Sequence, residues 1–435
     1  MEKIYTSAEL LTAVQKNQSS VLEIQNSMSF DSSIILPARM KLVGAAGSTI
    51  FLSFINSNGF GLTGNNTLSN ITIQTAPTHR AIFIQTVQKD LGEIRLENLT
   101  VTGQIQLITR ENTLKTKLTA KNIDIVASDT RKFPEQPHKY GANVYQGAFT
   151  IYNYNSNPDS QIEANLEDIS VGRADAPVIG SGIFIAGFNE EGGRVLVNKL
   201  TTKAIYTNGM IPQGQPNLIT GAIFILTGAK AKQIISKENV VSYGTNDMVL
   251  DVWGEVTDWI LEGPVFSYGP NGIGFVNFGV VHTFKAKSKI ETFGLGARGF
   301  NQYDGTIKEA TFHSITTHGN GSIGIQISKP VGDITIENNV ETNGALGKTL
   351  VKGVLIDLAA DGISVKEGGK VKQLHVKNSI VTNGENVNSY HVDGGIVERF
   401  SVGGKVIANG NNSTPVMIEN NGYSSTKDVQ IEQKQ

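Results

Sequence analysis

The residues of this chain that could carry out acid–base chemistry on a ligand gather between residues 298 and 318. Arg298 supplies a cation, Tyr303 a phenol, Asp304 a carboxylate and His318 an imidazole. Elimination or epimerisation of an acidic sugar needs a base, an acid and a cation that neutralises the sugar carboxylate. We therefore predict a catalytic group consisting of Arg298, Tyr303, Asp304 and His318. The alternative is that Arg298 and Asp304 form a salt bridge at a turn.

Aromatic and amide side chains near this group indicate a ligand-binding stripe. Trp253, Phe278 and Tyr303 recur at intervals of 25 residues. Rings in such a row form a platform on which sugar rings stack, while neighbouring polar groups bind the sugar hydroxyls. The alternative is that the rings only stabilise one another. The predicted substrate-binding residues are Asp247, Asp251, Trp253, Asn277, Phe278, Asn301, Gln326 and Lys348.

Three of these candidates have a second interpretation or a more specific expected position. Strand alternation places Asn277 beside Gln302 on the inward side, where the two amides would bond each other. Lys348 is expected two repeats from Arg298 in the same column of side chains. A second aromatic column, whose rings need no ligand to explain them, consists of Tyr243, Tyr268, Phe293 and His318.

The spacing of the carboxylates disfavours a glycoside hydrolase. Such an enzyme places two carboxylates about 5–10 Å apart. From strand dimensions, Asp251 and Asp304 are expected about 14 Å apart, and Asp247 and Asp251 about 13 Å apart. If the protein is an enzyme, a lyase or an epimerase is therefore favoured over a hydrolase.

A 25-residue repeat indicates which elements position these residues. A Ser/Thr-x-Gly phrase ends at Gly244, Gly269, Gly294, Gly319 and Gly344. Between these glycines, apolar residues alternate with period two in runs of strand length, and no helical pattern fits. Three short strands per 25 residues predict one coil of a parallel β-helix, with coils stacked about 4.8 Å apart.

Stacked coils place equivalent residues in ladders. One inward ladder is predicted to contain Leu250, Phe275, Phe300, Ile325 and Leu350, and another Val265, Ile290, Ile315 and Val340. Alternation along each strand then turns the neighbouring residues outward. The expected outward columns are Asp251, Val276, Asn301 and Gln326, and next to them Trp253, Phe278, Tyr303 and Ser328.

The expected organisation is a cap, a solenoid and a tail. The cap contains an amphipathic helix whose N-cap is Thr6 or Ser7 and which covers the open end of the first coil. The polar insertions near 128–147 and 210–221 have two interpretations: they are ordinary excursions between strands, or they wall a groove beside the aromatic stripe. The predicted ranges are 1–20 for the cap, 21–425 for the β-helix with its regular coils at 242–344, 426–435 for the tail, and insertions near 128–147, 210–221 and 357–370.

The helical cap and the segments LPARMKLVGAAG, GFGLTGNNTLSNITIQT and GDITIENN resemble the pectin-lyase-like superfamily. The resemblance covers essentially the whole chain and implies an all-β, single-stranded, right-handed parallel β-helix solenoid. It implies no single activity, because that superfamily holds lyases, hydrolases, epimerases, phage tailspikes and non-catalytic adhesins. The Asn-Thr-Asp, Asp-Asp and Arg-Ile-Lys motifs of its hydrolases and the Arg-x-Pro-x-x-Arg run of its pectate lyases are absent from this sequence.

Composition narrows the class of protein further. The formal net charge is −2 and there is no long basic run, so no nucleic-acid partner is expected. The chain has no cysteine, which excludes disulfides and thiolate metal sites, and we expect no metal and no cofactor. No apolar run is long enough to span a membrane. No signal peptide precedes the first strands, which fits a cytoplasmic protein or a secreted one whose signal has been removed.

The sequence supports two hypotheses about function. The first is a carbohydrate-active or carbohydrate-binding β-helix protein whose partner is an acidic polysaccharide or another glycan. The second is a non-catalytic structural or adhesive scaffold, whose function is its length and stability. The sequence determines neither the substrate nor the oligomeric state.

Overall fold

A computed structural model describes residues 1–18, 20–85, 88–351 and 353–433 of the chain. Within these residues the protein is all-β, with 58% of the chain in strands arranged in long parallel sheets and one short helix near the N-terminus. The prediction of an all-β, solenoid-like protein is confirmed at this level. No helix in the described residues has the length and apolar character needed to cross a membrane. The strands fall into two compact units.

The helix α1 (Ser7–Lys16) begins where the sequence predicts it. Thr6 is the N-cap: its hydroxyl accepts a hydrogen bond from the backbone N–H of Glu9, and the Glu9 carboxylate accepts one from the N–H of Thr6. This reciprocal arrangement satisfies backbone donors that have no partner inside the helix. Leu10 and Ala13 are buried, so the helix packs through one face.

Unit 1 contains residues Met1–Pro137, Tyr145–Thr207 and Ile225–Gln233. Its strands, two of which run past these limits along the chain, are β1 (Glu2–Ile4), β2 (Val21–Ile24), β3 (Met28–Phe30), β4 (Ile34–Leu36), β5 (Lys41–Gly44), β6 (Phe51–Phe54), β7 (Phe60–Leu62), β8 (Thr67–Gln74), β9 (Arg80–Ile84), β10 (Asp90–Thr102), β11 (Gln104–Arg110), β12 (Lys115–Ala127), β15 (Gly147–Tyr154), β16 (Gln161–Val171), β17 (Val178–Ile179), β18 (Ser181–Ala186), β19 (Arg194–Asn208) and β21 (Ala229–Ser236). One parallel ladder connects β2, β5, β8, β10, β12, β16 and β19. A second connects β4, β7, β9, β11, β15 and β18.

Unit 2 contains residues His138–Val144, Asn208–Phe224 and Ile234–Gln435. Its strands are β13 (His138–Lys139), β14 (Ala142–Val144), β20 (Leu218–Ile225), β22 (Val240–Ser242), β23 (Asp247–Val252), β24 (Glu255–Leu261), β25 (Val265–Ser267), β26 (Ile273–Asn277), β27 (Val280–Ala286), β28 (Ile290–Thr292), β29 (Arg298–Gln302), β30 (Thr306–Phe312), β31 (Ile315–Thr317), β32 (Ile323–Ile327), β33 (Val331–Ile336), β34 (Val340–Thr342), β35 (Gly347–Val351), β36 (Val354–Leu358), β37 (Ile363–Val365), β38 (Lys370–Val376), β39 (Ile380–Thr382), β40 (Asn388–Asp393), β41 (Ile396–Val397), β42 (Phe400–Val402), β43 (Lys405–Ala408), β44 (Thr414–Glu419), β45 (Tyr423–Ser424) and β46 (Gln430–Gln433).

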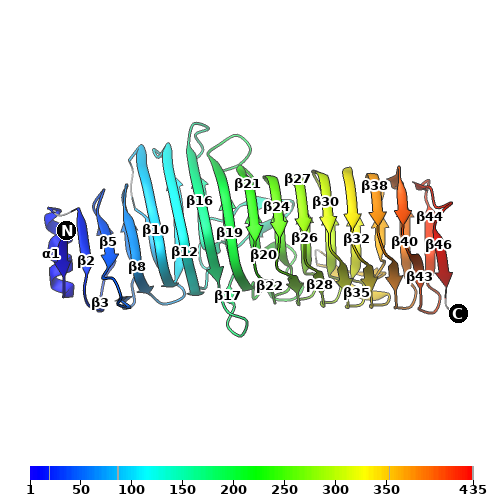
Figure 1. The fold of residues 1–435 in the computed structure, drawn as a ribbon, viewed down its shortest axis with the longest axis horizontal. Helices are drawn as coiled ribbons and strands as arrows, with labels where there is room; N and C mark the ends of the chain where they lie inside the picture. The colour runs from blue at the N-terminus through cyan, green and yellow to red at the C-terminus, as the bar shows by residue number, and fades with distance from the viewer. Residues whose placement is uncertain (19, 86–87, 352, 434–435) are drawn as a thin grey trace. The chain divides into compact units, whose positions relative to one another are not determined.

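Three parallel ladders run through unit 2, as expected for coils of three strands. Face 1 consists of β23, β26, β29, β32, β37, β40 and β44. Face 2 consists of β24, β27, β30, β33 and β38, and Figure 1 shows its strands lying side by side. Face 3 consists of β22, β25, β28, β31, β34, β39, β43 and β46.

Residues 25 apart lie opposite one another on face 1. Leu250 pairs with Phe275, Phe275 with Phe300, and Phe300 with Ile325. All four side chains are fully buried, so this part of the predicted inward ladder is confirmed. The second predicted ladder, from Val265 to Val340, is likewise in register on face 3.

The predicted ladder is wrong at its last member. Ile325 pairs with Ile363, whereas Leu350 lies in β35, which forms an antiparallel hairpin with β36. The hairpin adds chain between the glycine phrases at Gly344 and Gly384. Its residues have the alternation of a strand, and sequence alternation alone does not distinguish an antiparallel excursion from the next parallel coil.

The glycines of the repeated phrase mark a close approach between neighbouring turns. A Cβ atom on Gly269 would overlap the carbonyl oxygen of Gly244, and a Cβ atom on Gly294 would overlap that of Gly269. Only glycine lets the backbones approach so closely. This contact explains why the repeat ends on glycine in each coil.

Candidate functional site

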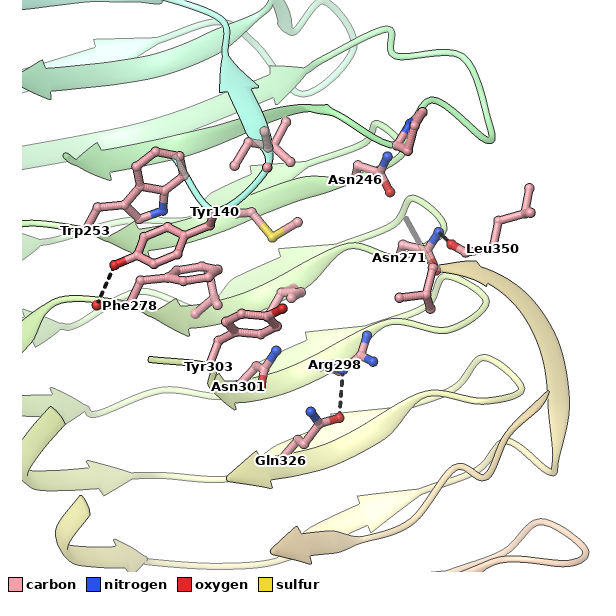
Figure 2. A pocket seen from close by; sticks show the side chains of 18 residues that line it. Tyr140, Asn246, Trp253, Asn271, Phe278, Arg298, Asn301, Tyr303, Gln326 and Leu350 are labelled. Atoms are coloured by element: carbon pink, nitrogen blue, oxygen red, sulfur yellow. Dashed lines mark hydrogen bonds between the residues drawn. The ribbon is translucent and has the colours of Figure 1, made fainter. Parts of the chain in front are cut away.

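A pocket of about 160 Å³ lies against the outward side of face 1 in unit 2. Its floor comes from Val276, Asn301 and Gln326, which lie in register on β26, β29 and β32. Because the adjacent residues 275, 300 and 325 point into the core, strand alternation turns these three side chains outward. The predicted outward column is therefore confirmed for these residues, and Figure 2 shows the polar members of the floor beside Arg298.

A row of aromatic rings forms one wall of the pocket. The ring centroids of Trp253 and Phe278 lie 5.9 Å apart, and those of Phe278 and Tyr303 lie 4.8 Å apart. The planes of the two pairs meet at 68° and 41°. The three residues that the sequence placed in one column are therefore brought together, but the rings are tilted rather than parallel.

The aromatic row is covered, which the sequence did not predict. Tyr140 stacks on Phe278 with a centroid distance of 4.5 Å, and its hydroxyl donates to the carbonyl oxygen of Phe278 at 3.3 Å. It also meets Trp253 edge to face at 5.4 Å. Trp253 is consequently only 4% exposed, so an open stacking platform is replaced by a partly enclosed pocket (Figure 2).

Two hairpins provide the cover. Tyr140 lies in the antiparallel hairpin of β13 and β14. On the opposite side, Leu350 of β35 lines the pocket, and its carbonyl oxygen accepts a hydrogen bond from the Asn271 amide at 2.6 Å. The Asn271 amide oxygen in turn accepts a hydrogen bond from the Thr349 hydroxyl at 2.7 Å. Pro216 and Ile219, from the insertion predicted at 210–221, also line the pocket.

Arg298 is the cation of the pocket. Its Nε donates to the Gln326 side-chain oxygen at 3.1 Å, and its Nη1 donates to the Gly296 carbonyl oxygen at 3.1 Å. Among the described residues no carboxylate forms an ion pair with it, so the predicted alternative of an Arg298–Asp304 salt bridge is wrong. Burial lowers the pKa of Arg298 to about 10, and the nearby Tyr303 opposes that change. Arg298 therefore remains a cation at neutral pH, half-buried and without a counter-ion in the described part of the chain.

Asn301 offers an unused acceptor on the pocket floor. Its side chain is 4% exposed and lines the pocket. Its Oδ1 atom has no hydrogen-bond partner in the described part of the chain. Leaving a buried amide oxygen unpaired costs about 1–3 kcal/mol. A ligand hydroxyl in the pocket would remove this cost.

Neither predicted aspartate on β23 lines the pocket. Asp247 is fully buried and accepts hydrogen bonds from the backbone N–H groups of Gly244 at 2.9 Å and Gly209 at 3.1 Å. The hydroxyls of Ser242 and Thr220 also donate to it. Burial raises the pKa of Asp247 above its ordinary value, against the effect of these donors. Four donors on one carboxyl group indicate a residue that holds turns together.

Asp251 is also fully buried, and its environment is poorer in donors. The indole N–H of Trp253 donates to one of its oxygens at 3.2 Å, and the other side-chain oxygen has no partner in the described residues. Burial raises the pKa of Asp251 well above its usual range. Asp251 thus contacts Trp253 of the aromatic wall from behind. Its burial disfavours the charged form of the carboxyl group.

Three further candidates, Asn277, Asp304 and Lys348, also lie outside the pocket lining. Asn277 is buried and donates to the Gln302 side-chain oxygen at 3.2 Å, as the inward interpretation predicted. Asp304 is half exposed, with its carboxylate 3.9 Å from the Lys329 ammonium. Lys348 pairs with Asp357 on the β35–β36 hairpin and its side chain is 68% exposed.

The expected column position of Lys348 is wrong for the same reason as that of Leu350. Arg298 pairs with Ile323, and β32 continues to β37 rather than to β35. Lys348 therefore occupies no position in the ladder that contains Arg298.

His318 belongs to the second aromatic column. Its ring stacks on that of Phe293 at 4.7 Å, and its Nε2 lies 2.7 Å from a carboxylate oxygen of Glu291. It does not line the pocket. Of the four predicted catalytic residues, the structure thus places only Arg298 and Tyr303 in the pocket.

Sequence reasoning did not single out Tyr140, Asn246, Asn271 or Leu350 as ligand contacts. Tyr140 lies in a predicted insertion, but its distance of 138 residues along the chain from Phe278 gives no period to follow. The break of the 25-residue step after Gly344 was the only signal for the hairpin that carries Leu350.

Comparison with known proteins gives no further assignment. No family model, curated protein or solved structure matches this chain.

Proposed function

We propose that the pocket binds one carboxylate-bearing sugar ring, and that the protein is a carbohydrate-binding or carbohydrate-active protein for acidic saccharides. The observation that carries this proposal is the half-buried Arg298 with no carboxylate partner among the described residues. We also propose that the solenoid is of the right-handed, pectin-lyase-like class with coils of about 25 residues. The register of face 1 and the N-terminal helix support that assignment.

The charge of Arg298 favours an anionic ligand. A cation that is partly removed from water gains most from a charged partner, and guanidinium groups pair with carboxylates through two parallel hydrogen bonds. Gln326 and the Gly296 carbonyl oxygen hold the guanidinium in place and leave its remaining N–H donors for such a ligand. A uronate carboxylate supplies the matching pair of oxygens.

The other lining groups favour a sugar ring over a simple acid. Tyr303 is 37% exposed and presents an aromatic face at the pocket. The unpaired Oδ1 of Asn301 would accept a hydrogen bond from a ring hydroxyl. Pockets that combine apolar walls with a few oriented polar groups are typical of small-molecule sites.

The volume of the pocket favours a single ring. A cavity of ~150 Å³ holds one benzene molecule, so a pocket of about 160 Å³ has room for one sugar ring at most, with part of the ring at its open side. A monosaccharide or the terminal ring of a longer chain therefore fits better than an internal segment of a polysaccharide.

The described lining contains no carboxylate, so two-acid hydrolysis finds no support in it. If the protein is catalytic, the chemistry that fits is removal of the proton next to the sugar carboxylate, in elimination or epimerisation. Arg298 would neutralise the carboxylate, and Tyr303, in its phenolate form, would take the proton. In elimination the C–O bond to the departing sugar oxygen breaks as the double bond forms, and the Tyr303 phenol returns the proton to that oxygen. In epimerisation water supplies a proton to the other face of the carbon, and Tyr303 releases its own proton to solvent.

Calorimetric titration with a uronic acid and the corresponding neutral hexose tests the proposal. We expect the uronic acid to bind at least about tenfold more tightly, equivalent to about 1.4 kcal/mol. Arg298→Gln should remove this preference. Arg399→Gln, at an exposed arginine of the same unit, should leave it unchanged. Equal affinities for the two sugars, or an unchanged preference in Arg298→Gln, would contradict the proposal.

The alternative of a non-catalytic scaffold is favoured by the second aromatic column and by an asparagine row beside it. The amides of Asn343, Asn383 and Asn409 bond one another in series at 2.7 Å. Such rows stabilise stacked coils without a ligand. A wild-type protein that binds no saccharide would support this alternative.

A further inference from the structure

A cluster of one histidine and two carboxylates, side chains of the types that bind metal ions, lies on face 1 outside the pocket. His391 and Asp393 are two residues apart on β40. In the parallel ladder of β40 and β44, the backbone of Asp393 lies opposite that of Glu419. Residues two apart on a strand point to the same side. The potential ligand atoms of the three residues all lie within 4.8 Å of one another. None of the three lines the pocket that contains Arg298.

The histidine of this cluster is held in one orientation from behind. His391 is 8% exposed, and its Nδ1 lies 2.8 Å from a carboxylate oxygen of Asp361, which is itself 3% exposed. The other Asp361 oxygen accepts a hydrogen bond from the backbone N–H of Asn388 at 2.8 Å. A carboxylate that binds one ring nitrogen of a histidine and so directs the other toward a metal is a recurrent feature of metal sites.

The second ring nitrogen points toward the remaining ligands. Nε2 of His391 lies 2.9 Å from a carboxylate oxygen of Glu419. Around a zinc ion, nitrogen and oxygen ligands lie about 2.0–2.2 Å from the metal. The side chain of Glu419 is 46% exposed, so it can make the small adjustment that such a shell requires. Its exposure also leaves a position for solvent.

The charges of the surroundings favour a dication. The carboxylates of Asp361, Asp393 and Glu419 lie close together around His391. Their lysine partner is Lys366, whose ammonium lies 3.2 Å from the Asp393 carboxylate. The Asn420 amide also donates to Asp393, at 2.7 Å. The Lys366 side chain is 37% exposed, so its ammonium can move into water when a metal takes its place.

We propose that His391, Asp393 and Glu419 bind one divalent transition-metal ion of the zinc type, with Asp361 as the residue that positions His391. One imidazole and two carboxylates make a nitrogen–oxygen ligand set that suits zinc and its neighbours in the first transition row. The sequence suggested no metal, because Glu419 lies 28 residues along the chain from His391 and the three residues match no recognised ligand spacing. This site is independent of the saccharide pocket.

Titration of the chelator-treated, full-length protein with zinc chloride tests the proposal, with cobalt(II) as a spectroscopic probe. We expect one ion per chain with a dissociation constant of about 10 μM or tighter, and a visible cobalt spectrum displaced by zinc. His391→Gln and Glu419→Gln should each weaken binding at least about tenfold. His375→Gln, at a surface histidine of β38 that bonds Ser401, should not change it.

Each other outcome overturns the proposal. Without a metal, His391 would act as an imidazolium between Asp361 and Glu419, and zinc would then bind weakly, non-stoichiometrically or equally well to all variants. Glu419→Gln guards against misfolding as an explanation, because the Glu419 side chain is 46% exposed and the change conserves its shape. Thermal melts of each variant verify the fold. Saccharide affinity should be the same with and without zinc, so failure of this site leaves the pocket hypothesis untouched.

Discussion

Unit 2 carries two aromatic columns with the same 25-residue step, and the structure makes them differ. In the stack of Tyr243, Tyr268, Phe293 and His318, successive rings lie 5.3, 4.8 and 4.7 Å apart, with interplanar angles of 11°, 7° and 6°. In the row of Trp253, Phe278 and Tyr303, the rings are tilted by 68° and 41°. The stack is regular and partly exposed, whereas the row is irregular and covered by Tyr140.

This difference separates a structural repeat from a candidate site. In the stack each ring contacts the equivalent ring of the next coil, so the rings stabilise one another and need no ligand. In the row, Tyr140 from outside the repeat fills part of the space. Within the described residues, Arg298 beside the row has no carboxylate partner and Asn301 keeps an unpaired oxygen. A column that departs from the geometry of its own repeat is therefore where a ligand is best sought.

The largest effect is expected from breaking the turns that carry the stack. Asp247→Ala would leave the donors of Ser242, Thr220, Gly209 and Gly244 without their acceptor, and we expect a loss of about 3 kcal/mol in the free energy of unfolding. Denaturant titration measures this loss. Asp258→Ala, at a half-exposed aspartate of β24, should change stability by less than about 0.5 kcal/mol. A small effect at Asp247 would show that the turns do not depend on it.

The second prediction concerns pH and the carboxyl behind the aromatic row. The pKa of Asp251 is raised well above its ordinary value by burial. The native state therefore holds its proton at pH values where the unfolded chain has released it. The contribution of this group to stability is then greatest below about pH 4, the unfolded pKa, and falls as pH rises through the folded pKa, by about 1.4 kcal/mol per pH unit.

The variant Asp251→Asn replaces the titrating carboxyl with an amide and should therefore flatten the dependence of stability on pH. We expect the melting temperature of the wild type to fall relative to that of Asp251→Asn as pH rises from 4 to alkaline values. Parallel profiles for the two proteins would mean that Asp251 is not the protonated group.

A third prediction distinguishes the two columns directly. Tyr268→Ala removes a ring stacked on both sides and should cost about 1 kcal/mol of stability with no change in uronate affinity. Tyr140→Ala removes part of the pocket wall and a ring that contacts Phe278 and Trp253. It should therefore weaken uronate binding by a similar free energy as well as lower stability by about 1 kcal/mol. Melting curves and calorimetry on both variants make the test. Loss of binding in Tyr268→Ala would contradict the structural role of the stack.

The smallest effect is expected at the end of the stack. Burial tends to raise the pKa of Glu291, but hydrogen bonds from Lys289 and His318 hold it below its ordinary value. The ionised Glu291 carboxylate therefore stabilises the fold above the pKa that Glu291 has in the unfolded chain. This stabilisation is lost as the pH falls through the lower pKa of Glu291 in the folded protein. For a partly exposed pair we expect Glu291→Gln to cost less than about 1 kcal/mol, and less still in 1 M salt. A large, salt-independent loss in thermal melts would contradict this.

A constant period makes the position of each equivalent residue predictable from the sequence, and the prediction fails where the period breaks. The ladder from Leu250 to Ile325 and the column of Val276, Asn301 and Gln326 result from a step of 25 residues, since stacked coils leave equivalent residues no other position. Lys348 and Leu350 were misplaced because an antiparallel hairpin has the same alternation as a coil strand.

The period of the sequence could not predict that Tyr140 covers the aromatic row, nor that three proposed metal ligands lie together. The contact of Tyr140 with Phe278 joins residues with no common period, and it depends on how a hairpin packs over a face. His391, Asp393 and Glu419 meet through the register of β40 and β44, in a part of unit 2 where the coils are no longer 25 residues long. Long-range packing of irregular segments is not encoded in local alternation.

The central claim, that Arg298 makes the pocket selective for an acidic ring, can be tested with the tryptophan already in the pocket wall. The chain has two tryptophans, and Trp259 is fully buried in the core, so Trp259→Phe leaves Trp253 as the sole indole reporter. We predict a saturable change in the Trp253 fluorescence on titration with a uronic acid. The dissociation constant for the neutral hexose should be at least about tenfold higher. No change with either sugar, or the same midpoint for both, would contradict the claim.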